Sequence, residues 1–405
     1  MTRILLALLG MSCFGTLALA ENFKQPRNKN WLALASTSDK DQAIGIARHV
    51  RWEANSVRVV RAVNGYFAVI AGPYAARDIG QFRASAAGKN FNSLPKDALL
   101  SDGSRYVETV WQEIGDGSIG LHSYSLGKPV QLSAGAFVVR VSAEKLGSEN
   151  AYTKIDGKDD KGEFHFEIGK DVPLEEQSSA EMMRSESFFH AAAVKLIAGS
   201  DSPQVVVTQF SGGAHCCTAT YIAARDASAG AWSLTTSAPR DGDGFTYEDV
   251  DGDGAKELIA VDNAFLYAFD SYAGSVAPIQ IYKLRDGKLQ DVSLEPAMHS
   301  RLVQDLAGME WEAKVQQDTR KTNGYLAGWV AAKIRLGQGD EAWRVFMRDY
   351  DHTSTFGPQE CKSGKTVDDC AADDLQPIAI PKALAQFLSD NGYTPLPKAA
   401  QAELN

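Results

Sequence analysis

Residues 21–112 alternate between short apolar runs and one-sided helical patterns. The expected strands cover residues 31–36, 56–63, 66–74 and 106–111, and the expected helices cover residues 39–50 and 75–86. In the first helical run the apolar residues fall on one face that can pack on a sheet; they are Ala43, Ile44, Ile46, Ala47 and Val50. The pattern predicts a small α/β unit in the order βαββαβ.

The pattern changes twice farther along the chain. Residues 126–293 hold short β-branched or aromatic runs separated by Gly, Asp, Asn and Pro, which is typical of a mainly antiparallel β domain. From residue 294 to 405, apolar residues such as Leu326, Val330 and Ile334 return to near-helical spacing. We therefore expect an α+β fold in which the β domain is followed by a helical C-terminal segment.

The first 20 residues have the pattern of a secretory signal peptide. Arg3 precedes an apolar stretch that starts at Ile4, and Ala18 and Ala20 provide a small-x-small cleavage site. No later run approaches the roughly 18 consecutive apolar residues of a membrane span. We expect cleavage near Ala20, no transmembrane segment in the mature chain, and a periplasmic or secreted location.

The charge balance narrows the set of partners. The chain carries 51 Asp and Glu residues against 41 Lys and Arg residues, a formal net charge of -10, and its basic residues are not clustered. Affinity for phosphate polymers depends on clustered Lys and Arg. Nucleic acid and anionic membrane are therefore not expected as main partners.

Four carboxylates lie within nine residues between two predicted strands. Asp249, Asp251 and Asp253 occupy alternate positions, Gly254 follows them, and Glu257 precedes an apolar run. This density of negative charge needs a counter-ion, and the spacing is that of loops that bind Ca²⁺ through oxygen ligands. The sequence predicts a calcium site; the other interpretation is a solvated turn without metal.

The second half of this loop indicates its type. The backbone carbonyl of Ala255 is expected at position 7, but position 12, where an EF-hand has a bidentate Glu, is Ala260 in a strand-like run. The loop instead resembles the Asp-x-Asp-x-Asp-Gly-x-x-Asp/Glu loop of FG-GAP and VCBS-type repeats. That resemblance implies a structural Ca²⁺ that clamps two strands and is held by Asp249, Asp251, Asp253, Ala255 and Glu257.

The N-terminal unit resembles the SPOR domain, an α/β module of bacterial envelope proteins that binds peptidoglycan glycan strands stripped of their peptides. The likeness lies in two strand-helix halves and in Ala71-Gly72-Pro73-Tyr74, which matches the family's Val-Gly-Pro-Phe. The first strand, residues 31–37, lacks the Gln, Gly and Phe of the family pattern. The resemblance implies peptidoglycan glycan, or an envelope protein, as a partner.

Three aromatic side chains of this unit are candidates for ligand contact: Trp31, Tyr66 and Tyr74. Aromatic rings on a sheet face can stack on sugar rings. Aromatic residues in strands also serve as core or edge packing. Both interpretations stay open at the level of sequence.

Four cysteines remain after the predicted cleavage, an even number in an oxidising compartment. Cys361 and Cys370 are expected to close a short polar loop by a disulfide bond. Cys216 and Cys217 are adjacent in the run SGGAHCC, where they either form a vicinal disulfide or remain buried thiols.

Two classes of function follow from these patterns. One is an exported, non-catalytic envelope protein with a SPOR-like module and a calcium-stabilised β domain that serves as an interaction surface. The other is a periplasmic hydrolase that uses a carboxylate pair, or Cys216 with His215, His190 or His165 as the base. Adjacent residues on a strand point to opposite faces, so the closeness of Cys216 and His215 in sequence is weak support for a catalytic pair. A zinc site at His215, Cys216 and Cys217 is also disfavoured, because the sequence has no C-x-x-C pair. The sequence therefore favours the non-catalytic protein.

Overall fold

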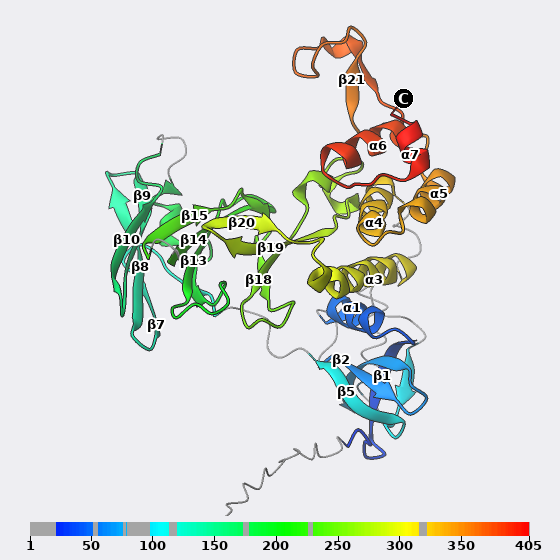
Figure 1. Ribbon diagram of the computed structural model, residues 1–405, viewed down its shortest axis with the longest axis horizontal. Coiled ribbons are helices and arrows are strands. Elements are labelled where there is room, and N and C mark those ends of the chain that lie inside the picture. Colours follow the sequence, from blue (N-terminus) through cyan, green and yellow to red (C-terminus); the bar gives the residue numbers. More distant parts are fainter. Residues whose placement is uncertain are drawn as a thin grey trace, which may run out of the picture.

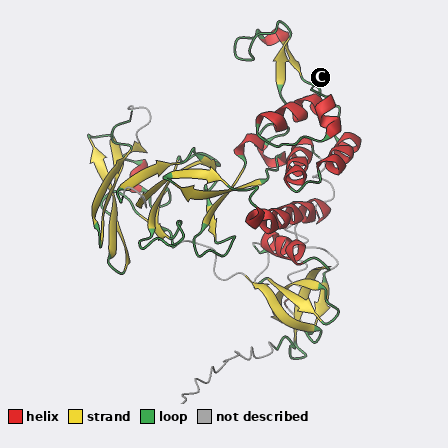
Figure 2. Cartoon of the chain, viewed as in Figure 1, coloured by secondary structure: helices red, strands yellow, loops and turns green. Residues whose placement is uncertain are grey.

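The computed structural model describes residues 22–51, 56–75, 78, 98–112, 120–172, 178–225, 230–315 and 322–404. Figure 1 shows an N-terminal sheet, a stack of helices and a group of antiparallel sheets, and Figure 2 shows that helices and sheets are largely segregated. The expected α+β class, with mainly antiparallel sheets and C-terminal helices, is confirmed. The predicted signal peptide lies outside the described residues.

The N-terminal unit is an antiparallel sheet with one described helix, α1, on it. Its elements are β1 (Lys29–Thr37), α1 (Lys40–Val50), β2 (Arg58–Ala62), β3 (Phe67–Ala75), β4 (Leu99–Ser101) and β5 (Tyr106–Gln112). Helix α1 begins after Asp39, whose side chain accepts a hydrogen bond from the backbone N–H of Gln42 at 3.0 Å. Its apolar face is buried against the sheet, as the spacing of Ala43, Ala47 and Val50 predicted.

The strand order of this sheet is β4-β1-β3-β2-β5. The predicted strand at 106–111 is β5, which pairs with β2, while the edge beside β1 is formed by β4, which the sequence did not predict. Nearly all of the expected second helix, residues 75–86, lies outside the described residues. The described residues therefore do not show the complete βαββαβ order.

The middle of the chain forms three further antiparallel sheets. Their strand orders are β10-β9-β8-β7, β15-β14-β13-β12-β6 and β17-β18-β19-β20. The strands are β6 (His122–Ser123), β7 (Val130–Ala134), β8 (Phe137–Leu146), β9 (Asn150–Asp159), β10 (Gly162–Ile168), β11 (Ser178–Ser179), β12 (Phe189–Val194), β13 (Gln204–Phe210), β14 (Cys216–Arg225), β15 (Trp232–Thr236), β16 (Arg240–Asp241), β17 (Thr246–Glu248), β18 (Glu257–Val261), β19 (Ile279–Arg285) and β20 (Lys288–Asp291). The central sheet contributes to two cores, one shared with each neighbouring sheet. This layering satisfies the apolar residues on both faces of β13.

The C-terminal segment is helical, as expected, and contains a small hairpin. The elements are α3 (His299–Val315), α4 (Asn323–Arg335), α5 (Gly339–Asp349), β21 (Gln359–Cys361), β22 (Leu375–Pro377), α6 (Ile380–Asp390) and α7 (Lys398–Ala402). The helices bury Trp343 and Phe346 in their common core. The hairpin β21–β22 projects away from the helices (Figure 1), and the predicted disulfide bond joins Cys361 to Cys370.

Helix α3 joins the N-terminal unit to the rest of the molecule. It crosses α1 so closely that a Cβ atom on Gly45 would lie 2.1 Å from the carbonyl oxygen of Gln304. Farther along α3, Trp311 is buried in the core of the N-terminal unit. The closest approach of the two helices thus depends on a residue without a side chain.

An ionic contact closes the same junction. The carboxylate of Glu248, at the end of β17, binds the guanidinium of Arg48 on α1 and accepts a hydrogen bond from Arg301 on α3 at 3.3 Å. Glu248 belongs to the β domain, so one side chain connects all three parts of the chain.

Replacing Gly45 by Ala tests the helix crossing. Helix propensity alone would stabilise α1 by about 1 kcal/mol, but the clash with the Gln304 carbonyl is expected to lower the free energy of unfolding by about 2 kcal/mol. Gly308→Ala is the control, because its Cβ would lie 3.5 Å from the nearest atoms, an ordinary contact. Thermal unfolding of both variants measures the difference, and a stabilised Gly45→Ala protein would contradict the close crossing.

The buried carboxylate of Asp159 should make the stability of the protein depend on pH. Its side chain, 1% exposed, accepts hydrogen bonds from Arg225 at 2.6 and 2.9 Å and from the indole of Trp232 at 3.3 Å. Burial acts to raise the pKa of Asp159, but the hydrogen bonds from Arg225 and from the Lys161 N–H outweigh it, and the pKa lies below its ordinary value. The stabilisation is present above about pH 4, the unfolded pKa, and is lost as pH falls through the folded pKa.

Asp159→Asn should therefore lower the free energy of unfolding at pH 7 by about 3 kcal/mol. Its melting temperature should converge on that of the wild type below about pH 4. The exposed neighbour provides the control Asp160→Asn, which should change little at any pH. A constant gap between Asp159→Asn and wild type from pH 7 to pH 3 would refute the role of the carboxylate.

Candidate functional site

The acidic loop, residues 249–257, connects β17 to β18. Its carboxylates fold the backbone around themselves, since the side chain of Asp249 accepts a hydrogen bond from Gly254 N–H at 3.0 Å and that of Asp253 accepts one from Ala255 N–H at 2.8 Å. Glu257 is buried and accepts from Val250 N–H at 2.6 Å. The loop is a compact turn between two strands, as predicted, and has no flanking helices of the EF-hand kind.

The carboxylates converge on an ammonium group. Lys283, on the neighbouring strand β19, places its Nζ atom 2.5 Å from Asp251, 2.9 Å from Asp253 and 3.2 Å from Glu257. The need for a counter-ion was correctly inferred from sequence. In the structure Lys283 supplies this counter-ion. Lys283 could not be identified from sequence, because it lies on the neighbouring strand in space but far from the loop along the chain.

The pKa shifts in the loop follow from these contacts. Burial raises the pKa of Glu257, whereas the hydrogen bond from Lys283 lowers the pKa of Asp253. Burial acts to lower the pKa of Lys283, but its hydrogen bonds to the three carboxylates outweigh this effect and raise the pKa above its ordinary value. Lys283 is therefore charged at neutral pH.

The loop also has the donor set for a hard cation. Carboxylate oxygens of Asp249, Asp251 and Glu257 lie within 4.8 Å of one another, and oxygen ligands of this type suit Ca²⁺. Since Lys283 binds two of these carboxylates, a cation at their centre would have to displace its ammonium group. The donor set fits calcium, with Lys283 as its competitor.

A second cluster lies where the central sheet meets the loop that follows β18. His215 Nδ1 lies 3.0 Å from Asp241 Oδ1, and His215 Nε2 lies 3.0 Å from the hydroxyl of Tyr267. Tyr272 donates a hydrogen bond to Asp241 Oδ2 at 2.6 Å and stacks on the imidazole with a ring-centroid distance of 3.8 Å. The rings of His215, Tyr267 and Tyr272, together with the carboxylate of Asp241, are named the aromatic cluster below.

The polar groups of the aromatic cluster form one chain. A carboxylate only accepts hydrogen bonds, so a neutral His215 carries its proton on Nδ1 and accepts from the Tyr267 hydroxyl at Nε2. The hydrogen bond to Asp241 raises the pKa of Tyr272 to about 12, which keeps its hydroxyl a donor. The order Tyr267, His215, Asp241, Tyr272 is thus fixed by donor and acceptor chemistry.

The structure does not assemble a cysteine nucleophile with a base. Cys216 and Cys217 are joined by a disulfide bond, and His215 is turned toward Tyr267 and Asp241. His165 contacts Asp156 on the strand next to it. Asp241 lies at the centre of a polar chain, because its carboxylate contacts both His215 and Tyr272. Tyr267 and Tyr272 were not identified from sequence, because nothing in the local pattern distinguishes them from the other aromatic residues of the β domain.

The three N-terminal aromatic residues do not form one surface. Trp31 is 3% exposed, and its indole donates a hydrogen bond to the carbonyl of Phe23 at 2.9 Å on the sheet face opposite α1. Tyr74 packs against the core on the α1 face. Tyr66, in the β2–β3 turn, is 47% exposed. Trp31 is buried and Tyr74 is partly buried against the core, whereas Tyr66 is the exposed residue among the three.

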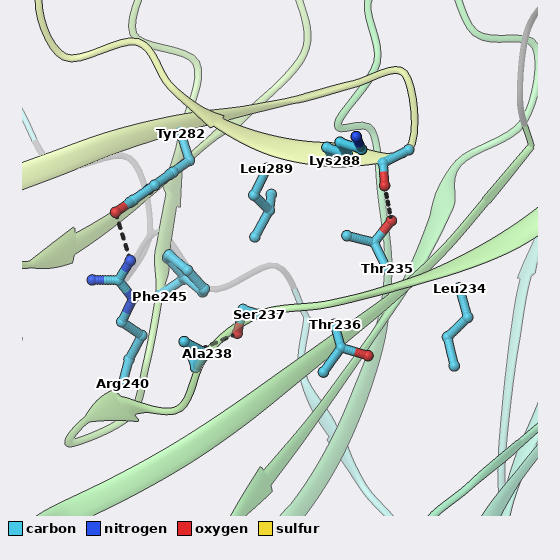
Figure 3. A pocket seen from close by; sticks show the side chains of 11 residues that line it. Leu234, Thr235, Thr236, Ser237, Ala238, Arg240, Phe245, Tyr282, Lys288 and Leu289 are labelled. Carbon is cyan, nitrogen blue, oxygen red and sulfur yellow. Dashed lines mark hydrogen bonds between the residues drawn. The ribbon is translucent and has the colours of Figure 1, made fainter.

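A cavity of about 520 Å³ lies between β15–β16 and β19–β20. Figure 3 shows Arg240 and Tyr282 pointing toward one another beside Phe245, and the guanidinium of Arg240 donates a hydrogen bond to the Tyr282 hydroxyl at 2.5 Å. Arg240 also donates to Gln280 at 2.8 Å. The cavity lining contains no carboxylate among the described residues, so the cavity is separate from the acidic loop.

Comparisons with known proteins extend over different parts of the chain. Residues 302–392 match the sll0997 C-terminal domain family. The chain is 34% identical over 399 residues to the uncharacterized protein y4bJ of Sinorhizobium fredii, which covers 97% of this chain and 60% of that protein. It is 36% identical over 193 residues to the probable thylakoid lumen protein sll0997 of Synechocystis sp., which covers 47% of this chain and 56% of that protein.

The chain thus spans 60% or less of the length of these two relatives. No solved structure matches it significantly. Among the described helices, none combines the length and the apolar character that crossing a membrane requires.

Substitution of Lys283 tests the two counter-ions against each other. In the presence of a chelator, Lys283→Gln should lower the free energy of unfolding by about 3 kcal/mol, roughly 6–12 °C in melting temperature for a domain of this size. Added Ca²⁺ should restore the melting temperature of Lys283→Gln more than it raises that of the wild type, because the competing ammonium is gone.

Arg285→Gln is the matched control, since Arg285 lies two residues along the same strand and pairs with a partly exposed Glu295. Its loss should cost less than about 1 kcal/mol. Asp251→Asn should abolish any response to calcium. If Lys283→Gln has the same melting temperature with chelator and with Ca²⁺, the loop does not bind calcium and Lys283 is its counter-ion.

Proposed function

We propose that this protein is an exported, non-catalytic component of the cell envelope that associates with peptidoglycan glycan or with an envelope protein. The observation that carries the proposal is the state of the acidic loop. Its carboxylates bind Lys283 and backbone N–H groups within a turn, which is the arrangement of a structural clamp. General acid-base catalysis would instead need a carboxylate directed toward a substrate.

Export is supported by three separate features. The first 20 residues have the signal-peptide pattern, and the name of the Synechocystis relative, probable thylakoid lumen protein, describes a protein of a lumenal compartment. The disulfide bond between Cys361 and Cys370 suits an oxidising compartment. We propose a periplasmic or secreted location on these grounds.

Association with the wall is supported by the SPOR resemblance of the N-terminal unit. The described part of this unit has an antiparallel sheet in the order β4-β1-β3-β2-β5 with α1 packed on it. Without the additional edge strand β5, this order is compatible with a split βαββαβ arrangement. Tyr66 is the exposed aromatic residue that this proposal assigns to the glycan. The remaining β domain supplies a rigid surface, clamped by Ca²⁺ or by Lys283.

The hydrolase alternative lacks an assembled set of catalytic groups in the described residues. A disulfide bond occupies Cys216, and Glu248 is paired with Arg48 and Arg301. The protein is therefore expected to bind its partner without cleaving it.

Cosedimentation with purified cell-wall sacculi tests this function. Wild-type protein should sediment with sacculi without releasing soluble fragments, and Tyr66→Ala should weaken the sedimentation several-fold by removing an exposed ring. Val63→Ala, which alters another exposed apolar side chain close to Tyr66, is the control. Release of soluble muropeptides would favour the hydrolase, and no sedimentation of the wild type would overturn wall association.

A further inference from the structure

Tyr267 is held in an uncommon backbone conformation. Its φ angle is 63°, in the left-handed region that side chains other than Gly rarely adopt, and its backbone N–H donates a hydrogen bond to the hydroxyl of Ser275 at 3.1 Å. A bulky residue in this region costs about 1–3 kcal/mol. The side chain is nevertheless 52% exposed, so burial of its ring does not offset much of this cost. Such a conformation at the surface points to a role for the ring outside the core.

The aromatic cluster is rigid before any ligand arrives. Three separate segments provide it: the turn before β14, strand β16, and the loop between β18 and β19. The hydroxyl of Tyr267 is fixed by His215, and His215 is fixed by Asp241 and by stacking on Tyr272. Because these side chains are already ordered, a ligand that binds them costs less conformational entropy. This is the arrangement expected of a preorganised contact surface.

The charge of the cluster selects among ligands. The carboxylate of Asp241 is shielded from solvent, because both of its oxygens accept hydrogen bonds and its side chain is only 11% exposed. What reaches the surface is the ring of Tyr267, which is 52% exposed, and part of the His215 side chain, which is 31% exposed. The neighbouring Asp243 and the net charge of -10 disfavour an anionic ligand. A neutral ring with an apolar face and a hydroxyl rim fits this surface.

The adjoining residues extend the same character. Cys216 follows His215 directly and is exposed, and its disulfide bond to Cys217 makes it an uncharged group without a thiol proton.

We propose that the aromatic cluster binds a neutral pyranose ring of an envelope glycan, with the ring of Tyr267 stacked on the sugar. The inference rests on the proposed function, since it names the place at which the β domain meets the glycan. It assigns to His215 and Tyr272 the role of positioning Tyr267.

Titration calorimetry with chitotetraose, a neutral oligosaccharide, tests the site. Wild type should bind it, and Tyr267→Gly should bind at least roughly tenfold more weakly, a loss of about 1.4 kcal/mol. Gly adopts a positive φ without strain, so Tyr267→Gly should melt at or above the wild-type temperature, which separates lost binding from lost folding. Tyr267→Phe keeps the ring and should lose less affinity. The control Phe356→Ala removes an exposed aromatic ring of the helical segment and should bind like wild type.

A parallel titration with cellotetraose distinguishes the source of the glycan. Preference for chitotetraose indicates an N-acetylated strand such as that of the wall, and equal affinities indicate a polysaccharide site of broader range. If the wild type binds neither oligosaccharide, the proposal is wrong. This also covers the case in which the true partner of the cluster is a protein. If wild type and Tyr267→Gly sediment equally with sacculi and bind chitotetraose equally, this site is wrong while wall association stands. If wild type does not sediment with sacculi, it is the proposed function that fails.

Discussion

The carboxylate of Glu248 is the contact on which the arrangement of the three parts depends. It binds Arg48 of the N-terminal unit and Arg301 of the helical segment while belonging to the β domain. Burial, and after it the positive charge of Arg301, lower the pKa of Arg48, while the carboxylate of Glu248 acts in the opposite direction. Glu248 therefore neutralises part of the positive charge where α1 and α3 cross. Gly45 leaves the space that the crossing needs, because it has no side chain.

The acidic loop begins directly after Glu248, the last residue of β17. The conformation of the loop therefore affects the position of Glu248 in the junction. A compact loop holds the end of β17 in place and thereby the direction of the Glu248 side chain. Lys283 reaches the loop from β19 and ties the same sheet together. Whether the counter-ion is an ammonium or a calcium ion, like charges so close together require one. The loop thus links the end of β17 to β19 through Lys283.

The two surfaces proposed here for binding are formed by residues that do not belong to this junction. Trp31 and Tyr74 pack against the cores of the N-terminal unit, whereas Tyr66 of this unit is exposed. On the β domain, Tyr267 of the aromatic cluster is exposed. Arg240 and Asp241 are consecutive on β16, yet one lines the cavity and the other orders the aromatic cluster. This division follows from the alternation of side chains across a strand. A single short strand thus supports two neighbouring surfaces of different character.

Local patterns in the sequence determined the elements and much of their order. The spacing of Ala43, Ala47 and Val50 predicted α1, the alternation of short apolar runs predicted antiparallel sheets, and the Asp-rich spacing predicted a tight turn in need of a counter-ion. These properties depend on residues close together in the chain. Only the tertiary structure decided that Lys283 approaches the loop, that β4 rather than β5 lies beside β1, and that His215, Asp241, Tyr267 and Tyr272 meet. Each of these depends on which distant segments pack together, and periodicity along one segment carries no information about that choice.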